Sequence, residues 1–137
     1  MIPIDTYIFK ATAFCNLNCS YCYIFNLADK SPATRPKVMP IELVEIAAQR
    51  MVDQARQQNV RCLNIAFHGG EPLLAGTDWL RNTVDIFRKA GGDEIQFRFS
   101  LQSNGVLIDE DWIRLLAEFG IALSISLDGT PEIHDRT

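Results

Sequence analysis

The chain has 137 residues, of which 47% are hydrophobic and 22% charged, and its 17 acidic and 13 basic residues give a net charge of −4. This composition predicts a folded domain with a hydrophobic core and excludes a disordered chain. No segment concentrates Lys and Arg, so nucleic acid is not an expected partner. No apolar run approaches the ~18 residues of a membrane span, and no signal peptide is evident, so we expect a cytoplasmic protein that does not bind a membrane.

Strand and helix patterns alternate along the chain. The predicted elements, in chain order, are a strand at 6–11, a helix from Pro40 to near Asn59, a strand at 62–67, a helix from Thr77 to Gly91-Gly92, a strand at 95–102, a helix from Asp109 to Gly120 and a strand at 122–127. Thr77 and Asp109 carry side chains suited to N-caps, and the glycines suit helix ends. This alternation predicts an α/β fold with a parallel sheet.

The predicted strands have one apolar and one polar face. In the last three strands the odd-numbered positions are apolar, and the even-numbered positions carry polar residues such as Asn64, Arg98 and Ser124. A doubly wound sheet would bury both faces and need strands that are apolar throughout. We therefore expect the helices on the apolar face and a sheet that curls into part of a barrel around a polar lumen. Ile8 interrupts the pattern, so the facing of the first strand stays open.

Candidate functional residues follow every predicted strand. They are Cys15, Cys19 and Cys22 after the first strand, His68-Gly69-Gly70-Glu71-Pro72 after the second, Gln102-Ser103-Asn104-Gly105 after the third, and Ser126 with Asp128-Gly129 at the fourth. In a parallel barrel these positions share one rim. Three thiolates in C-x3-C-x2-C spacing suit an iron–sulfur cube and leave one iron without a protein ligand. The alternative is a structural zinc site completed by Cys62 or His68, although Cys62 starts its strand and is expected at the opposite end of the barrel.

The cysteine loop, with Tyr21 before its last cysteine, and the Gly69-Gly70-Glu71-Pro72 loop together resemble the signature of the radical S-adenosylmethionine enzymes. The resemblance implies a 4Fe-4S cluster on Cys15, Cys19 and Cys22, with the amino and carboxylate groups of S-adenosylmethionine on the open iron. It implies reductive cleavage of S-adenosylmethionine to a 5'-deoxyadenosyl radical, which abstracts a substrate hydrogen, and a low-potential electron donor such as flavodoxin or ferredoxin. The implied fold is a partial TIM-like barrel of the (β/α)6 type, truncated after about four strands.

The same resemblance implies which residues contact the cofactor. These residues are Tyr21, Gly69, Gly70, Glu71, Pro72, Gln102 and Ser126. Glycines allow a close backbone approach, and the Glu71 carboxylate can accept hydrogen bonds from the methionine ammonium. Tyr21 would lie near the adenine, and Gln102 and Ser126 would reach the ribose or carboxylate. Alternatively, Gln102 and Ser126 are satisfied polar residues of a wet lumen. No catalytic residue beyond the cluster ligands is assigned.

A narrower resemblance extends along nearly the whole chain. Phe67–Leu73, Gln102–Ile108, Ser126–Gly129 and His134-Asp135 are similar to the anaerobic sulfatase-maturase group, which acts on side chains of peptides and proteins. The segment from Tyr21 to Asp29, with Arg35 to Met39, looks more like the peptide maturases that join side chains into cyclophanes. Three functions stay open: peptide crosslinking, formylglycine formation by a sulfatase maturase, and a non-catalytic iron–sulfur electron carrier or metal-stabilised module.

The family pattern also sets the expected domain organisation. Such enzymes normally carry a six-unit partial barrel and a cysteine-rich domain with auxiliary clusters, so residues 1–137 are expected to be the N-terminal part of the core domain, with a cluster loop at 12–30. The later barrel units and the auxiliary-cluster domain are then expected to be absent. In the loop after the cluster, Asp29, Lys30 and Arg35 are expected to be solvated, and peptide binding is the alternative for them. His68 either contacts a ligand or bonds to neighbouring backbone.

Overall fold

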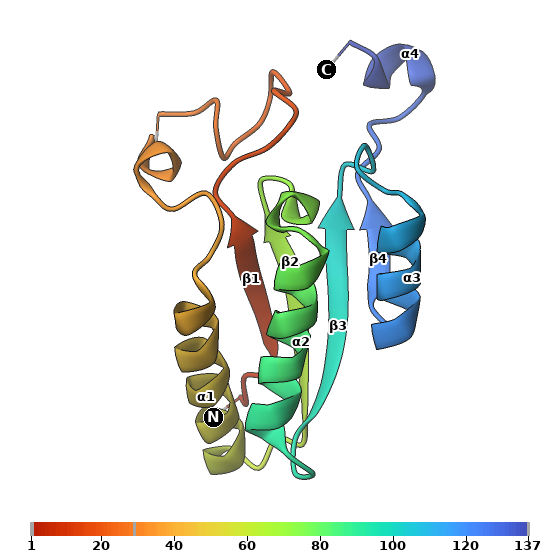
Figure 1. Ribbon diagram of the computed structural model, residues 1–137. Helices are drawn as coiled ribbons and strands as arrows, with labels where there is room; N and C mark the ends of the chain where they lie inside the picture. Colours follow the sequence, from red (N-terminus) through yellow and green to blue (C-terminus); the bar gives the residue numbers. More distant parts are fainter. Residues whose placement is uncertain (1, 29, 137) are drawn as a thin grey trace.

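The computed structural model describes residues 2–28 and 30–136. Its elements are β1 (Thr6–Thr12), η1 (Ser31–Thr34), α1 (Ile41–Gln57), β2 (Cys62–Gly69), η2 (Pro72–Ala75), α2 (Thr77–Gly91), β3 (Gln96–Ser103), α3 (Glu110–Phe119), β4 (Ala122–Ile125) and α4 (Pro131–His134), where η marks a 3-10 helix. The strands pair in parallel in the order β1-β2-β3-β4 (Figure 1). The predicted α/β fold with an open parallel sheet, as in part of a barrel, is confirmed.

The long helices cover one face of this sheet, where α2 packs against both α1 and α3 (Figure 1). Burial alternates along β2, in which Leu63, Ile65 and Phe67 are buried and the residues between them are partly exposed. The first strand follows the same phase, because Phe9 is buried whereas Ile8 on the opposite face is 70% exposed. The one-sided burial predicted from the sequence is therefore present in β1, β2 and β3, and it leaves the polar face open.

Aromatic rings join the sheet to α2 in the centre of the core. Phe67 stacks on Phe99 with the ring centroids 5.8 Å apart, and Phe87 of α2 meets Phe9 edge-on at 5.6 Å. Such pairs add about 0.5–1.5 kcal/mol each beyond their buried area. Trp79 packs edge-on against Phe67 and donates its indole N–H to the Met39 carbonyl at 2.8 Å. This packing fixes the strands whose carboxyl ends carry the candidate site.

Three of the predicted helix boundaries test the local signals, and two of them are confirmed. Asp109 caps α3, since its Oδ1 accepts a hydrogen bond from the Trp112 backbone N–H at 2.9 Å, and Gly120 ends that helix with a φ of 66°. The N-cap predicted at Thr77 is wrong. Thr77 is already the first residue of α2, because Gly76 precedes it with a φ of 89° and turns the chain from η2 into the helix.

The fourth strand departs from its prediction in length and burial. It ends at Ile125 and not at Leu127, and all of its residues are exposed. Leu123 and Leu127, which the alternation placed on the buried face, are 38% and 71% exposed. Within the described residues β4 pairs with β3 on one side, and the four-residue α4 that follows is too short to cover it. No helix among residues 2–28 and 30–136 is long and apolar enough to cross a bilayer.

Candidate functional site

The loops that follow β1 and β2 lie at the same rim of the sheet (Figure 1), where hydrogen bonds join their backbones. Gly70 N donates to Thr12 O at 3.2 Å, and Glu71 N donates to Phe14 O at 3.0 Å. A Cβ atom added at Gly70 would overlap the Phe14 carbonyl. The group that closely approaches the two glycines is thus the backbone of the cysteine loop.

Glu71 is a fully buried carboxylate that connects this pair of loops to the end of β3. Its Oε1 accepts from Leu73 N at 3.0 Å and from Ser103 Oγ at 2.9 Å, and its Oε2 accepts from Asn104 N at 2.8 Å. A carboxylate has about four acceptor positions, so one remains for a further donor. The predicted contact of Glu71 with the methionine ammonium stays a prediction, as does the role of Pro72, which is buried at the start of η2.

Asn104 extends the connection from Glu71 to the cysteines. Its Nδ2 donates to Asn16 Oδ1 at 2.8 Å and lies 3.8 Å from Cys15 Sγ in hydrogen-bonding geometry, while its Oδ1 accepts from Val106 N at 3.0 Å. Sequence reasoning assigned no cluster contact to Asn104. The available signal was its position in the rim motif that follows β3.

The cysteine loop is held by turns of its own. Cys22 N donates to Cys19 O at 3.0 Å, and the Asn26 side chain donates to the same carbonyl at 2.7 Å. Leu17 N donates to Cys15 Sγ at 3.4 Å. The three thiols are free and partly exposed, so they are available as ligands.

The arrangement of these thiols distinguishes a cluster from a single metal ion. Among the described residues, no three His, Cys, Asp or Glu side chains converge on a point from which they would hold one ion. A structural zinc ion takes four protein ligands, whereas three thiolates suffice for an iron–sulfur cube, in which each binds a separate iron. Cys62 lies at the amino end of β2, opposite the rim, so it does not complete a site with the trio. The donor set fits a cube better than zinc.

Gln102 and Tyr21 contact the loop after β4, and this loop contains a third predicted site residue, Ser126. Gln102 Nε2 donates to Ser126 Oγ at 2.8 Å, which brings these two residues together. The Tyr21 hydroxyl donates to the Asp128 carboxylate, and this hydrogen bond raises the pKa of Tyr21 to about 12. Their contacts with ribose, carboxylate and adenine remain predictions.

The other polar residues near the rim have local partners. His68 Nδ1 accepts a hydrogen bond from Gly69 N at 2.8 Å, which matches the neighbouring-backbone alternative for this histidine. Lys30 Nζ donates to Phe25 O at 3.1 Å. Arg35 is exposed, as expected, and it also lines a pocket beside β1. Asp29 lies outside the residues that the structure describes.

Comparison with known proteins decides the family. The family model described as the radical SAM superfamily matches residues 9–137. The chain belongs to this superfamily. Radical SAM enzymes use S-adenosylmethionine and an iron–sulfur cluster, so the two predicted cofactors are confirmed. The residue that contacts each cofactor atom stays a prediction.

The relatives of this radical SAM chain include sulfatase-maturating enzymes. It is 36% identical over 135 residues to the cysteine-type anaerobic sulfatase-maturating enzyme of Clostridium perfringens, which covers 98% of this chain and 35% of that protein. It is 33% identical over 121 residues to the serine-type enzyme of Klebsiella aerogenes, with coverages of 88% and 28%. The solved structure of native anSMEcpe with bound AdoMet and the Cp18Cys peptide matches with a TM-score of 0.80 and 31% identity, over 99% of this chain and 34% of that chain. The chain thus spans about a third of the length of these relatives.

Proposed function

We propose that this chain provides the cluster- and cofactor-binding part of a radical SAM enzyme that modifies a side chain of a peptide or protein. The hydrogen-bonded rim carries the proposal, because Glu71 and Asn104 connect the cysteine loop to the loops after β2 and β3. The comparison adds support, since the similar anSMEcpe structure holds both AdoMet and a peptide. Substrate, electron donor and whole-enzyme activity are all part of the proposal.

The residues of the chain divide the work of binding the cofactors. Cys15, Cys19 and Cys22 would hold the cluster on a loop whose turns are already formed. Glu71 is fully buried, so it would hold the rim loops in place beside the Gly69-Gly70 backbone, and a contact of its fourth acceptor position with the methionine ammonium remains a prediction. When bound, the cluster and S-adenosylmethionine supply one-electron chemistry that removes a hydrogen atom from the substrate. A low-potential flavodoxin or ferredoxin would deliver the electron.

Two modifications are candidates, each favoured by a different observation. Formylglycine formation is favoured by the similarity to two sulfatase-maturating enzymes. Cyclophane crosslinking is favoured by the resemblance of the segment from Tyr21 to Asp29, and of Arg35 to Met39, to peptide maturases. The rim residues serve the step that both reactions share, so the proposal at the level of peptide modification does not depend on which is correct.

Cofactor cleavage gives the direct test. After anaerobic reconstitution with iron and sulfide, the full chain is incubated with dithionite and S-adenosylmethionine, and we expect 5'-deoxyadenosine to form. Cys19→Ala should abolish both the cluster spectrum and the product, whereas Cys62→Ala should retain them, because Cys62 lies at the opposite end of β2. A 4Fe-4S paramagnetic signal that never changes on addition of S-adenosylmethionine would contradict the proposal and favour an electron carrier.

Mass spectrometry of candidate peptide substrates separates the two modifications. A crosslink removes two hydrogen atoms from the peptide and leaves its sulfur content unchanged. Conversion of a cysteine to formylglycine removes two hydrogen atoms and exchanges sulfur for oxygen, whereas conversion of a serine removes two hydrogen atoms only. Both conversions leave an aldehyde that hydrazides label, which a crosslink does not. Formation of either product would support peptide modification. If 5'-deoxyadenosine forms but neither a sulfatase peptide nor a precursor peptide is modified, the assignment is restricted to the superfamily.

A further inference from the structure

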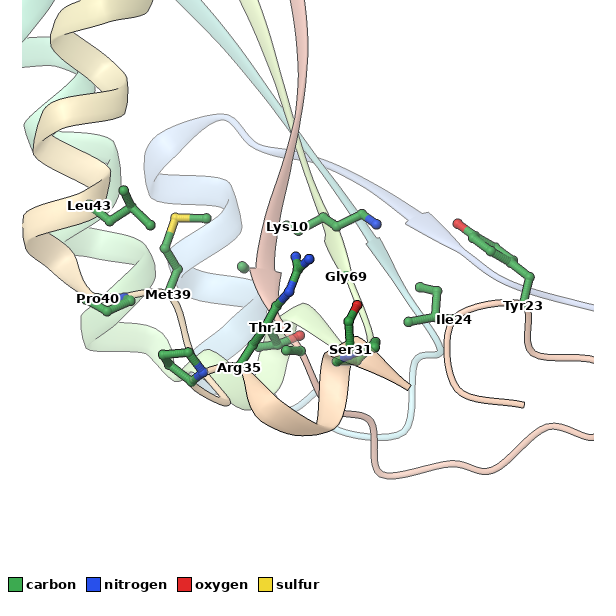
Figure 2. Close-up of a pocket in the computed structure, with 14 residues that line it drawn as sticks. Lys10, Thr12, Tyr23, Ile24, Ser31, Arg35, Met39, Pro40, Leu43 and Gly69 are labelled. Atoms are coloured by element: carbon green, nitrogen blue, oxygen red, sulfur yellow. The ribbon is translucent and has the colours of Figure 1, made fainter. Parts of the chain in front are cut away.

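A pocket of about 440 Å³ lies between the end of β1 and the chain segment that leads from the cysteine loop into α1 (Figure 2). Its wall is apolar on the side of Met39 and Leu43. Lys10 and Arg35 bring two positive charges into the same space, and no Asp or Glu is found among the described residues that line it. The pocket is therefore cationic within a chain whose net charge is −4.

The two cations have no anionic partner among residues 2–28 and 30–136, because the ion pairs formed there involve other basic side chains. In Figure 2 the Arg35 side chain extends from the end of η1 toward Lys10, and the Tyr23 hydroxyl also points toward Lys10. A guanidinium fork and an ammonium group in one partly apolar cavity suit a carboxylate, which the guanidinium can bind with two parallel hydrogen bonds.

The position of the pocket relates it to the reaction site. Tyr23 and Ile24, which line it, directly follow Cys22, and Gly69 begins the loop that carries Glu71. A group bound in the pocket therefore lies next to both loops to which we assign the cofactors. Lys10 lies on the open polar face of β1, which is the face toward the expected lumen.

We propose that this pocket anchors the peptide substrate by binding the carboxylate of an acidic residue. A large apolar residue next to that acidic residue in the peptide would pack against Met39 and Leu43. The inference rests on the proposed function and adds a substrate class to it. The methionine carboxylate of S-adenosylmethionine is a second possible source of the bound carboxylate, since it has the same chemistry as the acidic side chain. The apolar wall favours the peptide, because an acidic residue beside Leu or Phe offers both a charge and an apolar group, and the test below separates the two sources.

The test uses two matched peptides and the reconstituted full chain with S-adenosylmethionine. An equimolar mixture of Ac-Gly-Phe-Glu-Leu-Gly-NH2 and its Gln counterpart is equilibrated with the protein under anaerobic conditions, and mass spectrometry measures the ratio retained. We expect the Glu peptide to be enriched about tenfold. In the Lys10→Gln, Arg35→Gln double variant the ratio should fall to near unity, while the Kd for S-adenosylmethionine should change by less than about twofold.

Two variants control for net charge and for folding. Lys30→Gln removes one positive charge from the same segment but lies outside the pocket, with its Nζ on the Phe25 carbonyl, so it should retain the Glu preference. The Lys10→Glu, Arg35→Glu double variant should instead favour a peptide with Lys in place of Glu, a reversal that an unfolded protein cannot show.

Several outcomes would overturn the inference. They are a wild-type ratio near unity, retention of neither peptide, and a ratio that the double variant leaves unchanged. Weaker binding of S-adenosylmethionine with an unchanged peptide ratio would assign the two cations to the cofactor carboxylate. Absence of 5'-deoxyadenosine would defeat the proposed function, but the peptide ratio would still report on the pocket, so the two failures are distinguishable.

Discussion

Replacing Glu71 with Gln preserves the shape of a fully buried side chain and changes its hydrogen-bonding capacity. Glu71 accepts three hydrogen bonds, from the backbone N–H groups of Leu73 and Asn104 and from the Ser103 hydroxyl. Glutamine has one acceptor oxygen, and its amide group must take the place of the other oxygen. In either orientation the amide N–H groups face one of the two backbone N–H donors. The Ser103 hydroxyl can rotate, but a backbone N–H cannot.

The magnitude follows from this mismatch. A buried donor without an acceptor costs about 1–3 kcal/mol, and the remaining bonds lose charge assistance worth about 1 kcal/mol each. The smaller desolvation cost of a neutral amide offsets part of the loss. We therefore expect Glu71→Gln to lower the free energy of unfolding by about 2–4 kcal/mol, which shifts the urea midpoint down by about 1–2 M at an m value of about 2 kcal/mol/M.

The assay is urea unfolding of the apoprotein followed by circular dichroism, so that the result does not depend on cofactor loading. The control is Glu118→Gln, which removes a carboxylate from an exposed ion pair with Arg81 at 2.6 Å and should leave the midpoint almost unchanged. A Glu71→Gln protein that unfolds at the wild-type midpoint would refute the reasoning and show that the carboxylate does not hold the rim together.

Three further predictions test other contacts of the rim. Gly70→Ala should destabilise the protein by about 1–3 kcal/mol and lower its iron content after reconstitution, because the added Cβ overlaps the backbone carbonyl just before Cys15. Asn104→Leu should lower the cluster midpoint potential by about 20–60 mV in a redox titration followed by electron paramagnetic resonance, because an N–H···S bond to Cys15 is lost. Asp128→Ala should lower the pKa of Tyr21 from about 12 toward 10.0 in an alkaline ultraviolet titration. Because folding raises that pKa, the stability from Tyr21 is present below pH 10.0 and is lost as pH rises toward about 12.

Each of these predictions has a control and a contradicting result. Gly92→Ala, at a φ of 56° in open space, should retain its iron, so equal iron loss in both glycine variants would remove the steric explanation. An unchanged potential in Asn104→Leu would show that the contact with Cys15 does not persist in the loaded protein. Tyr21→Phe should remove the late-titrating tyrosine from the spectrum; its persistence would assign the high pKa to another residue.

Local patterns in the sequence predicted most of the fold. Alternation in β2 and β3 placed Leu63 and Phe99 on the buried face, because successive side chains of a strand point to opposite sides of the sheet. The cap at Asp109 was also readable, because its partner N–H lies three residues away. The prediction at Thr77 failed because Gly76 takes a positive φ that starts the helix by a different route.

The sequence by itself determined which chemistry the chain carries, since the cysteine spacing and the motifs after each strand are local features. Only the tertiary structure decided how those motifs meet. Glu71 bonds to Ser103 across 32 positions, and Asn104 bonds to Asn16 across 88. The cationic pocket likewise forms because the chain after the cysteine loop brings Arg35 back to β1, beside Lys10. Contacts between residues so far apart depend on how the loops pack at the rim, and no local periodicity specifies that packing.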